Sequence, residues 1–509
     1  MAADAAQDQG PEDVGSYLRE ISEVNGAALA SIACARALDA ASTFSARSHF
    51  AIPPHRPSAA SDGSGDEAEP SVYLTGHSLG LQPRSAQGAV MCELTKWAER
   101  GVAGHFEGEL PWASCEEAVV PLLGELVGAA DATLEVAAMN SLTVNLHLLM
   151  AAFYRPSAGR AGILIEAGAF PSDRYAVASQ VRHHGYDPAE WLTEVAPREE
   201  SGLLSTHDLL AAIDTLQDSL ALVLLGGVNY LTGQVLDMEA IARGVRRINA
   251  SRAARSEPPI LLGLDLAHAA GNVPLSLHDW GVDFAAWCTY KYLNAGAGCL
   301  GAIFVHSRHA ADDGTYPRLT GWWGVPHAPG PRFEMRHGFD AALGAAGFAC
   351  SNVNPLMVAC LLASLRTLRD AGGIQAARRK SRLLTGYLEL LLNEEELTVP
   401  RAAAQAQPAR CGIRIITPAD PRRRGCQLSL RVLPPPPPGG AEAESGSGPP
   451  GAMRELEAAL LSRGVVVDAR EPDIVRAAPV PLYNSYEDVR VFVLRLADAL
   501  VELARRWEK

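Results

Sequence analysis

The chain has 509 residues, of which 48% are hydrophobic and 20% charged, and it carries a formal net charge of −14. A chain of this length can bury a large core and normally divides into two or more domains. The acidic balance argues against nucleic acid as a partner, because binding to phosphates requires a basic surface.

Residues 1–15 are acidic and contain no apolar run, unlike a secretory signal or an arginine-rich transit peptide. We expect no membrane span, because the chain has no apolar window long enough to cross a bilayer. Nine cysteines follow no regular spacing and include no C-x-x-C pair. This pattern fits free thiols, with no structural zinc site and no metal. The expected location is therefore the cytoplasm.

In chain order, the pattern first predicts one amphipathic helix over residues 16–42. The polar stretch 58–70, which contains glycine and serine, is typical of a flexible linker. Residues 1–70 are therefore expected to form an N-terminal helix and linker.

Short apolar runs alternate with helix-like segments over residues 71–355. Such alternation predicts an α/β domain, with a mostly parallel sheet sandwiched by helices. The runs expected to form strands are LEVAAM (134–139), AGILIE (161–166), SLALVLLGG (219–227), ILLGLDLAH (260–268), VDFAAWC (282–288) and LGAIFVH (300–306).

Residues 356–509 are expected to form a smaller α+β domain. Its strands would be CGIRIIT (411–417) and CQLSLRVL (426–433), and its closing helix would cover 488–506. The Pro/Gly-rich insert 434–452 has almost nothing apolar to pack, so it is expected to be disordered.

Two glycine motifs are interpreted as structural. GHSLG (76–80) matches the nucleophile elbow of serine hydrolases, but helix and linker precede it instead of several strands. A tight turn is therefore favoured over a nucleophilic Ser78, and Pro83 would also interrupt the helix that an elbow requires. GAGCLG (296–301) matches a dinucleotide fingerprint, but a strand follows it where a helix is needed.

Lys291 ends an apolar run and is followed mainly by small residues, in AAWCTYKYLNAGAG (285–298). A buried ammonium is costly, so this lysine is either structural, with its amine reaching solvent, or a Schiff-base nucleophile. Asp265 ends the preceding predicted strand, at the edge of the sheet where α/β folds bind ligands. It could pair with the protonated pyridine nitrogen of pyridoxal phosphate, or simply cap a helix.

The stretch AMNSLTVNLHLLM (138–150) ends a strand and begins a helix at Leu142 and Thr143, with Asn140 or Ser141 as its cap. Free N–H groups at a helix start can bind a cofactor phosphate, although an ordinary capped helix has the same pattern. The anion site, the acid and the lysine follow one another in the order found in fold-type I pyridoxal-phosphate enzymes.

On these residues and on longer stretches, the chain resembles the kynureninase family from about residue 71 to 509, apart from the insert. The stretches that carry the resemblance are YLTGHSLGLQP, MNSLTVNLHLL, EAGAFPSDRYA, NYLTGQVLDM, DLAHAAGNVPLSLHDWGVDFAAWCTYKYLNAGAG, LTGWWG and RAAPVPLYNSYEDV.

The resemblance implies that Lys291 binds pyridoxal 5'-phosphate covalently, that Asp265 pairs with its ring nitrogen and that Tyr230 shares in catalysis. The other cofactor contacts it implies are Leu142, Thr143, Phe170, Pro171, Ser172, Asp173, His268 and Tyr290, with Trp322 and Asn352 from the neighbouring subunit of a homodimer. The substrate contacts it implies are Arg476 at the carboxylate, and His105, Ser351 and Asn352 near the aromatic ring.

The resemblance also implies hydrolysis of the Cβ–Cγ bond of L-kynurenine or 3-hydroxy-L-kynurenine. The products would be L-alanine and anthranilate or 3-hydroxyanthranilate, in tryptophan catabolism and NAD biosynthesis.

The alternatives are another fold-type I enzyme, such as a cysteine desulfurase or an aminotransferase, or an inactive cofactor-binding homodimer. Cys350 is the candidate thiol for a desulfurase, but its apolar setting predicts an inert group. His77 and the pair Gly226–Gly227 depart from the family pattern, which bears on substrate preference.

Overall fold

The structure is a computed structural model, and it describes residues 13–55, 69–198, 202–311, 314–326, 331–334, 337–399, 411–433 and 451–507. The predicted linker at 58–70 and the predicted disordered insert at 434–452 lie almost entirely outside these residues. The chain forms two compact units. The large unit comprises Pro83–Tyr230 and Val235–Arg369, and the small unit comprises the residues up to Gln82, Leu231–Gln234 and Asp370 onward.

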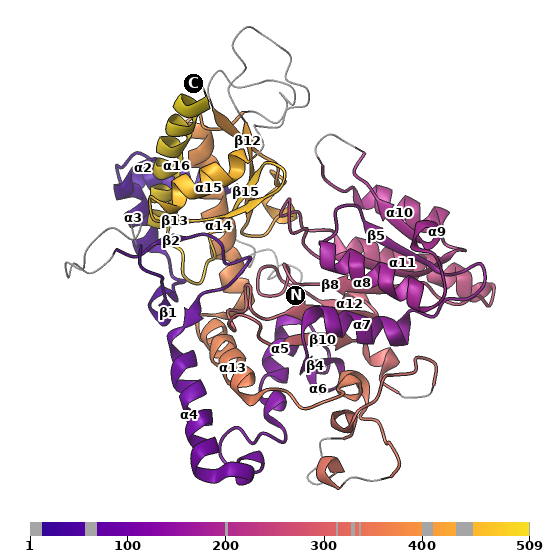
Figure 1. Ribbon diagram of the computed structural model, residues 1–509. Helices are drawn as coiled ribbons and strands as arrows, with labels where there is room; N and C mark the ends of the chain where they lie inside the picture. The colour runs from indigo at the N-terminus through magenta and orange to yellow at the C-terminus, as the bar shows by residue number, and fades with distance from the viewer. Residues whose placement is uncertain are drawn as a thin grey trace. The chain divides into compact units, whose positions relative to one another are not determined.

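Within the described residues, a seven-stranded sheet in the order β4-β10-β9-β8-β7-β5-β6 lies at the centre of the large unit (Figure 1). Only β10 runs against its neighbours, so the prediction of a mostly parallel sheet is confirmed. The strands are β4 (Val136–Met139), β5 (Gly162–Glu166), β6 (Leu192–Val195), β7 (Leu220–Gly226), β8 (Leu261–Asp265), β9 (Phe284–Cys288) and β10 (Gly301–Val305).

Helices cover this sheet because its inner strands are apolar on both faces. Every residue of β5, β8, β9 and β10 is buried, as in parallel sheets with helices on each side. Helix α7 packs against β9 and β10, α8 against α7 and β6, and α11 against α10 and β8. The helices of this unit are α4 (Arg84–Arg100), α5 (Val120–Val127), α6 (Ala132–Glu135), α7 (Leu142–Phe153), α8 (Pro171–His183), α9 (Pro188–Trp191), α10 (Thr206–Thr215), α11 (Met238–Ala254), α12 (Leu277–Trp280) and α13 (Pro355–Asp370).

The small unit is an α+β structure around a four-stranded sheet, in the order β11-β12-β15-β14. Its strands are β1 (Phe50–Ala51), β2 (Val72–Tyr73), β11 (Gly412–Ile415), β12 (Leu428–Leu433), β13 (Val465–Val466), β14 (Asp468–Arg470) and β15 (Ile474–Ala477). Its helices are α2 (Val14–Val24), α3 (Ile32–Ala41), α14 (Gly373–Glu394), α15 (Ala452–Leu461) and α16 (Tyr486–Trp507). The short strand β3 (Gln82–Pro83) lies at the boundary between the units.

The single helix predicted over 16–42 is instead two helices, α2 and α3. The chain turns between them at Gly26, which has a left-handed φ of 60°, and Ser31 then begins α3 by accepting a hydrogen bond from the Cys34 amide at 3.1 Å. Both helices pack within the small unit, α2 against α14 and α3 against α16. Helices α2 and α3 therefore share a core with the C-terminal part of the chain, unlike the separate segment that was expected.

In the part of the chain that the structure describes, no helix combines the length and the apolar character needed to cross a membrane.

Candidate active site

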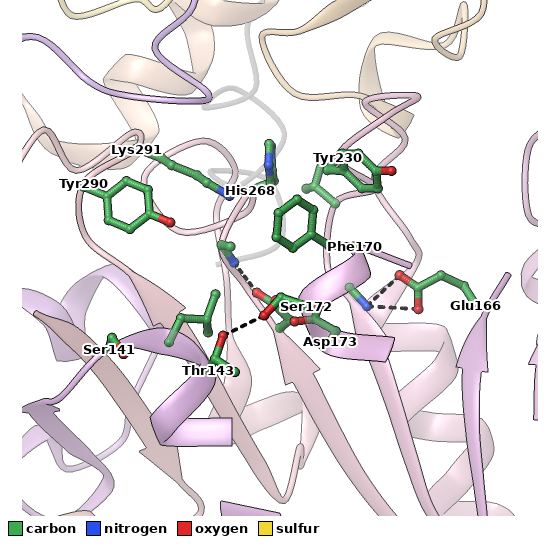
Figure 2. A pocket seen from close by; sticks show the side chains of 15 residues that line it. Ser141, Thr143, Glu166, Phe170, Ser172, Asp173, Tyr230, His268, Tyr290 and Lys291 are labelled. Carbon is green, nitrogen blue, oxygen red and sulfur yellow. Dashed lines mark hydrogen bonds between the residues drawn. The ribbon is translucent and has the colours of Figure 1, made fainter. Parts of the chain in front are cut away.

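A pocket of about 140 Å³ opens in the large unit where five strands of the same direction reach their carboxyl ends. The segments that follow β4, β5, β7, β8 and β9 form its walls, at the position where parallel sheets bind ligands. The lining residues are Ser141, Leu142, Thr143, Glu166, Phe170, Ser172, Asp173, Gly226, Val228, Tyr230, Asp265, Ala267, His268, Tyr290 and Lys291 (Figure 2).

Ten of the site residues named from the sequence lie together in this pocket: Leu142, Thr143, Phe170, Ser172, Asp173, Tyr230, Asp265, His268, Tyr290 and Lys291. Pro171 is not among its lining residues and instead begins α8. His105, Trp322, Ser351 and Asn352 belong to the large unit but do not line the pocket, and Arg476 belongs to the small unit.

Lys291 reaches into the pocket from the turn after β9 (Figure 2). Its side chain is largely buried, and its Nζ lies 5.7 Å from the ring centroid of Phe170. The residues after Lys291 form a tight turn, in which Asn294 has a left-handed φ of 53° and donates its amide to the Lys291 carbonyl at 3.0 Å. This turn holds the lysine backbone in place while its amine stays directed at the pocket.

Three carboxyl groups face the same pocket from neighbouring elements: Glu166 at the end of β5, Asp173 on α8 and Asp265 at the end of β8. The Ala267 amide donates to Oδ1 of Asp265 at 2.7 Å. The Gly226 amide donates to both carboxylate oxygens of Glu166, at 3.1 and 3.2 Å.

Burial and repulsion between neighbouring carboxylates raise the pKa of two of these acids, Glu166 and Asp173. Burial raises the pKa of Glu166 to about 7. Burial, the charge of Asp265 and a hydrogen bond with Asp265 together raise the pKa of Asp173 well above its usual value. A ligand with a positive charge would offset the repulsion among these acids, so this part of the pocket suits such a ligand.

The other side of the pocket suits an anion. Helices α7 and α8 both begin there, and among the described residues neither Ser141 nor Phe170 caps its own helix with a side-chain hydrogen bond. The hydroxyls of Thr143 and Ser172 lie 2.9 Å apart and link the two helix starts (Figure 2). Free N–H groups at two helix starts, with hydroxyls beside them, form a site for a phosphate.

The turn that aims α7 at the pocket is itself held by amide side chains. Asn140 has a left-handed φ of 47°, which asparagine tolerates better than most residues. The side chain of Asn145 accepts from Asn140 at 3.0 Å and donates to the Met139 carbonyl at 2.8 Å. These bonds close the turn, so the first N–H groups of α7 are left for a ligand.

The residues present fit pyridoxal 5'-phosphate. The helix starts suit its phosphate, the acids suit a protonated ring nitrogen, and Lys291 suits its aldehyde. Burial also raises the pKa of Tyr290, so its phenol stays protonated as a hydrogen-bond donor. A cavity of about 150 Å³ accommodates one six-membered ring, and this pocket is close to that size.

Sequence reasoning did not single out Glu166, Val228 or Ala267 as site residues, and it treated Gly226 only as a departure from the family pattern. For Glu166 a signal existed, because it ends the apolar run GILIE as Asp265 ends LLGLD. An acid at the end of a buried parallel strand lies at the ligand-binding edge in both cases.

The predicted ring-sensing residues lie elsewhere in the large unit. His105 and Trp322 both contact Phe333, with ring centroids 5.8 and 5.7 Å apart, in a partly exposed aromatic cluster. Ser351 and Asn352 are exposed and follow the short 3-10 helix Gly344–Phe348.

In the small unit, Arg476 is held by Asp468 and by Ser78, the serine of the GHSLG motif. Its guanidinium lies 2.9 Å from Asp468 across the β14–β15 pair and donates to the Ser78 hydroxyl at 3.0 Å. Ser78 in turn donates to Asp468. The hydroxyl therefore belongs to an ionic network, which is not the setting of a serine-hydrolase nucleophile.

The GHSLG segment forms the tight turn that was predicted. The amides of Ser78 and Leu79 both donate to the Thr75 carbonyl, at 2.9 and 3.2 Å. At Gly76 a Cβ would lie 1.9 Å from the Tyr483 hydroxyl and 2.7 Å from Val480, so only glycine fits.

Comparison with known proteins gives concordant results. The family model described as the kynureninase C-terminal domain matches residues 450–496. A kynureninase of Myxococcus xanthus (strain DK1622) is 48% identical over 432 residues, which cover 85% of this chain and 91% of that protein. A kynureninase of Eremothecium gossypii (strain ATCC 10895) is 45% identical over 452 residues, which cover 88% of this chain and 95% of that protein.

Solved structures resemble the chain in fold. The cystine C-S lyase C-DES, in complex with cysteine persulfide, has a TM-score of 0.63 at 17% identity and covers 84% of this chain and 97% of its own. A variant of C-DES with glycine covalently linked to its pyridoxal-phosphate cofactor also has a TM-score of 0.63, at 18% identity, covering 84% and 96%. The apo cysteine desulfurase of Thermococcus onnurineus NA1 has a TM-score of 0.61 at 16% identity, covering 85% and 95%.

Proposed function

The chain belongs to the kynureninase family, and from that premise we propose that the pocket around Lys291 hydrolyses the Cβ–Cγ bond of L-kynurenine or 3-hydroxy-L-kynurenine. Water supplies a hydroxyl to Cγ, which becomes the carboxylate of anthranilate or its 3-hydroxy form. Cβ keeps the bonding electron pair and takes a proton, which gives L-alanine. The observation that carries the proposal is one buried lysine facing both an acidic cluster and two helix starts.

The cofactor is pyridoxal 5'-phosphate, and when bound it supplies a protonated pyridine ring that withdraws electrons from the substrate. Its phosphate would be held by the N–H groups of α7 and α8, by Thr143 and Ser172, and by the protonated phenol of Tyr290. Phe170 would lie against the ring, with its own orientation fixed by edge-on contact with Tyr230 at 5.2 Å.

Lys291 has two roles in this proposal. Its amine would hold the cofactor covalently, and with the substrate bound it would accept the proton from Cα. The buried setting supports both roles, because it limits the water that would otherwise compete for the amine. A base positioned in this way contributes about 10²–10⁴-fold in rate.

Asp265 would keep the ring nitrogen protonated, and the neighbouring Ala267 amide and Asp173 support this role. The Ala267 amide orients the Asp265 carboxylate at 2.7 Å. Burial and the charge of Asp265 raise the pKa of Asp173, which favours its protonated form. It then adds a hydrogen bond to Asp265 without adding a second negative charge.

Arg476 would bind the α-carboxylate of the substrate. Asp468 lies between two guanidinium groups, 2.9 Å from Arg476 and 2.9 Å from Arg470. One carboxylate between two such cations leaves a net positive charge, which suits a substrate carboxylate.

A cysteine desulfurase is less well supported. That reaction needs a reactive thiol, but burial raises the pKa of Cys350 and its thiol contacts the Leu319 carbonyl at 3.5 Å. Cys288 is buried at the end of β9, and burial raises its pKa also. Neither thiol lines the pocket.

A homodimer in the cytoplasm is the proposed state of the protein. The aromatic cluster around Phe333 leaves Phe106 62% exposed and Trp322 38% exposed, which favours cover by a second copy. In that dimer Trp322 and Asn352 would complete the partner's cofactor site, and His105 and Ser351 would contact its substrate ring. All nine cysteines are free thiols, as suits a reducing compartment. Light scattering is expected to give twice the chain mass, and a monomeric mass would contradict the dimer.

The activity is tested by incubating the cofactor-loaded protein with L-kynurenine and measuring anthranilate and alanine. Equimolar release of both products is expected, and it should fall at least about 10⁴-fold in Lys291→Ala. Release of sulfide from cysteine without alanine release from either kynurenine would favour the desulfurase instead. A cofactor-loaded protein that is inactive on all three substrates would favour a binding protein that has lost activity.

A further inference from the structure

A second cavity, of about 440 Å³, lies entirely within the small unit. Helices α2, α3 and α14 and the segment after α3 line it, and Tyr486 adds the start of α16. None of its lining residues takes part in the proposed reaction. Its volume is well above the roughly 150 Å³ that accommodates a benzene ring.

About half of the wall of this cavity is apolar, and that half includes aromatic rings and branched aliphatic side chains. Tyr17, Phe44 and Tyr486 contribute rings, and Leu38 and Leu383 contribute branched aliphatic side chains. No carboxylate occurs among its lining residues in the described part of the chain. The cavity therefore suits an apolar ring and would not repel an anion.

Lys380 brings a cation into this apolar setting. The residue is 6% exposed, and its amine makes no hydrogen bond or ion pair with any residue that the structure describes. The closest aromatic contact of Nζ is with Phe44, whose ring centroid lies 5.8 Å away. Burial lowers the pKa of Lys380 to about 8, as expected for an ammonium without a direct partner.

The charged groups near Lys380 are engaged elsewhere. Asp39 accepts the amides of Tyr486 and Glu487 at 2.9 and 3.0 Å. Asp488 forms an ion pair with Arg47 at 2.5 Å. Both carboxylates lower the cost of burying the ammonium, but neither bonds to it. A buried cation that lacks a hydrogen-bonding partner and faces a cavity points to a ligand that supplies one.

We propose that this cavity binds a small aromatic carboxylate, with its carboxylate on Lys380 and its ring against the wall formed by Phe44 and Tyr486. The Ser42 hydroxyl already donates to the Phe44 carbonyl at 3.0 Å, and the lining residues Tyr17, Thr43 and Tyr486 also carry hydroxyls. The single ammonium of Lys380 matches the single charge of a carboxylate better than the larger charge of a phosphate. The site is separate from the pocket around Lys291 and does not depend on the reaction assigned to it.

Benzoate and 4-bromobenzoate are suitable probes for the cofactor-loaded protein. Crystals grown with 4-bromobenzoate are expected to show anomalous bromine density in the cavity beside Lys380. Calorimetry is expected to show that the affinity of this site for benzoate falls at least tenfold in Lys380→Met. Lys380→Arg, which keeps the charge, should retain most of the affinity.

Benzamide serves as the neutral control ligand and should bind at least tenfold more weakly than benzoate. Lys380→Met should fold and keep the steady-state rate of the wild type, because methionine replaces the lysine stem and removes a buried charge. Any one of three results would overturn the proposal: no bromine in the cavity, equal affinity of wild type and Lys380→Met, or benzamide binding as tightly as benzoate.

Discussion

Glu166→Gln should change how the stability of the cofactor-free protein depends on pH. Glu166 is 4% exposed, and both of its oxygens accept the Gly226 amide. Burial raises its pKa from the ordinary value of 4.5 to about 7. Glutamine keeps an oxygen that can accept the same amide but carries no charge at any pH.

Whether stability rises or falls with pH depends on whether the folded or the unfolded chain holds the proton of Glu166. Below pH 4.5 the carboxyl is protonated in the folded and the unfolded chain, and Glu166 costs no stability. Between pH 4.5 and about 7 the unfolded chain loses this proton while the folded chain retains it, so stability falls as pH rises. The difference of about 2.5 pH units, at about 1.36 kcal/mol each, corresponds to a loss of about 3 kcal/mol above pH 7.

The assay is urea unfolding of the wild type and of Glu166→Gln at pH 5.5 and at pH 8. Part of the loss has already occurred at pH 5.5, so the advantage of the variant should grow by about 2 kcal/mol between the two conditions. Glu99→Gln, on the exposed face of α4, is the control and should show no such growth. An advantage of Glu166→Gln that stays constant from pH 5.5 to pH 8 would refute the reasoning.

Three further substitutions, the last paired with a control, test the roles of other residues. Asp265→Asn should lower kcat for alanine release by about 10²–10³-fold, because the ring nitrogen loses its anionic partner; unchanged kcat would exclude that role. Arg476→Lys should raise KM for kynurenine about tenfold, with a smaller change in kcat, because lysine keeps the charge but not the two-pronged contact; an unchanged KM would place the carboxylate elsewhere. Gly76→Ala should lower the free energy of unfolding by about 1–3 kcal/mol through its contact with Tyr483. Gly88→Ala, which meets nothing within 4 Å on α4, should raise it by about 0.5–1 kcal/mol, and equal effects would contradict the packing argument.

The strands that could be predicted from the sequence are those buried on both faces. Continuous apolar runs predicted strands β4, β5, β7, β8, β9 and β10, because such runs are stable only in a sheet that is covered on both faces. The edge strand β6 was missed, since its LTEV sequence is only half buried and has no such run. The break between α2 and α3 was missed because both helices present apolar residues to one core, so the periodicity continues across the turn at Gly26.

The site residues that could be predicted are those whose side-chain chemistry is unusual for their place in the local sequence pattern. Lys291 and Asp265 stood out because a charged residue at the end of an apolar run is unusual. The role of Phe170 came only from the resemblance, since an aromatic residue before a helix has no distinctive pattern. The pairing of Arg476 with Ser78 joins residues about four hundred positions apart, and no local signal marks such a contact.

The most direct test of the central claim is to treat the cofactor-loaded protein with borohydride and locate the pyridoxyl group by mass spectrometry of its peptides. The account predicts one modified residue, Lys291, and loss of the label when Lys291 is replaced by alanine. A pyridoxyl group fixed on any other lysine, with Lys291 unmodified, would contradict it.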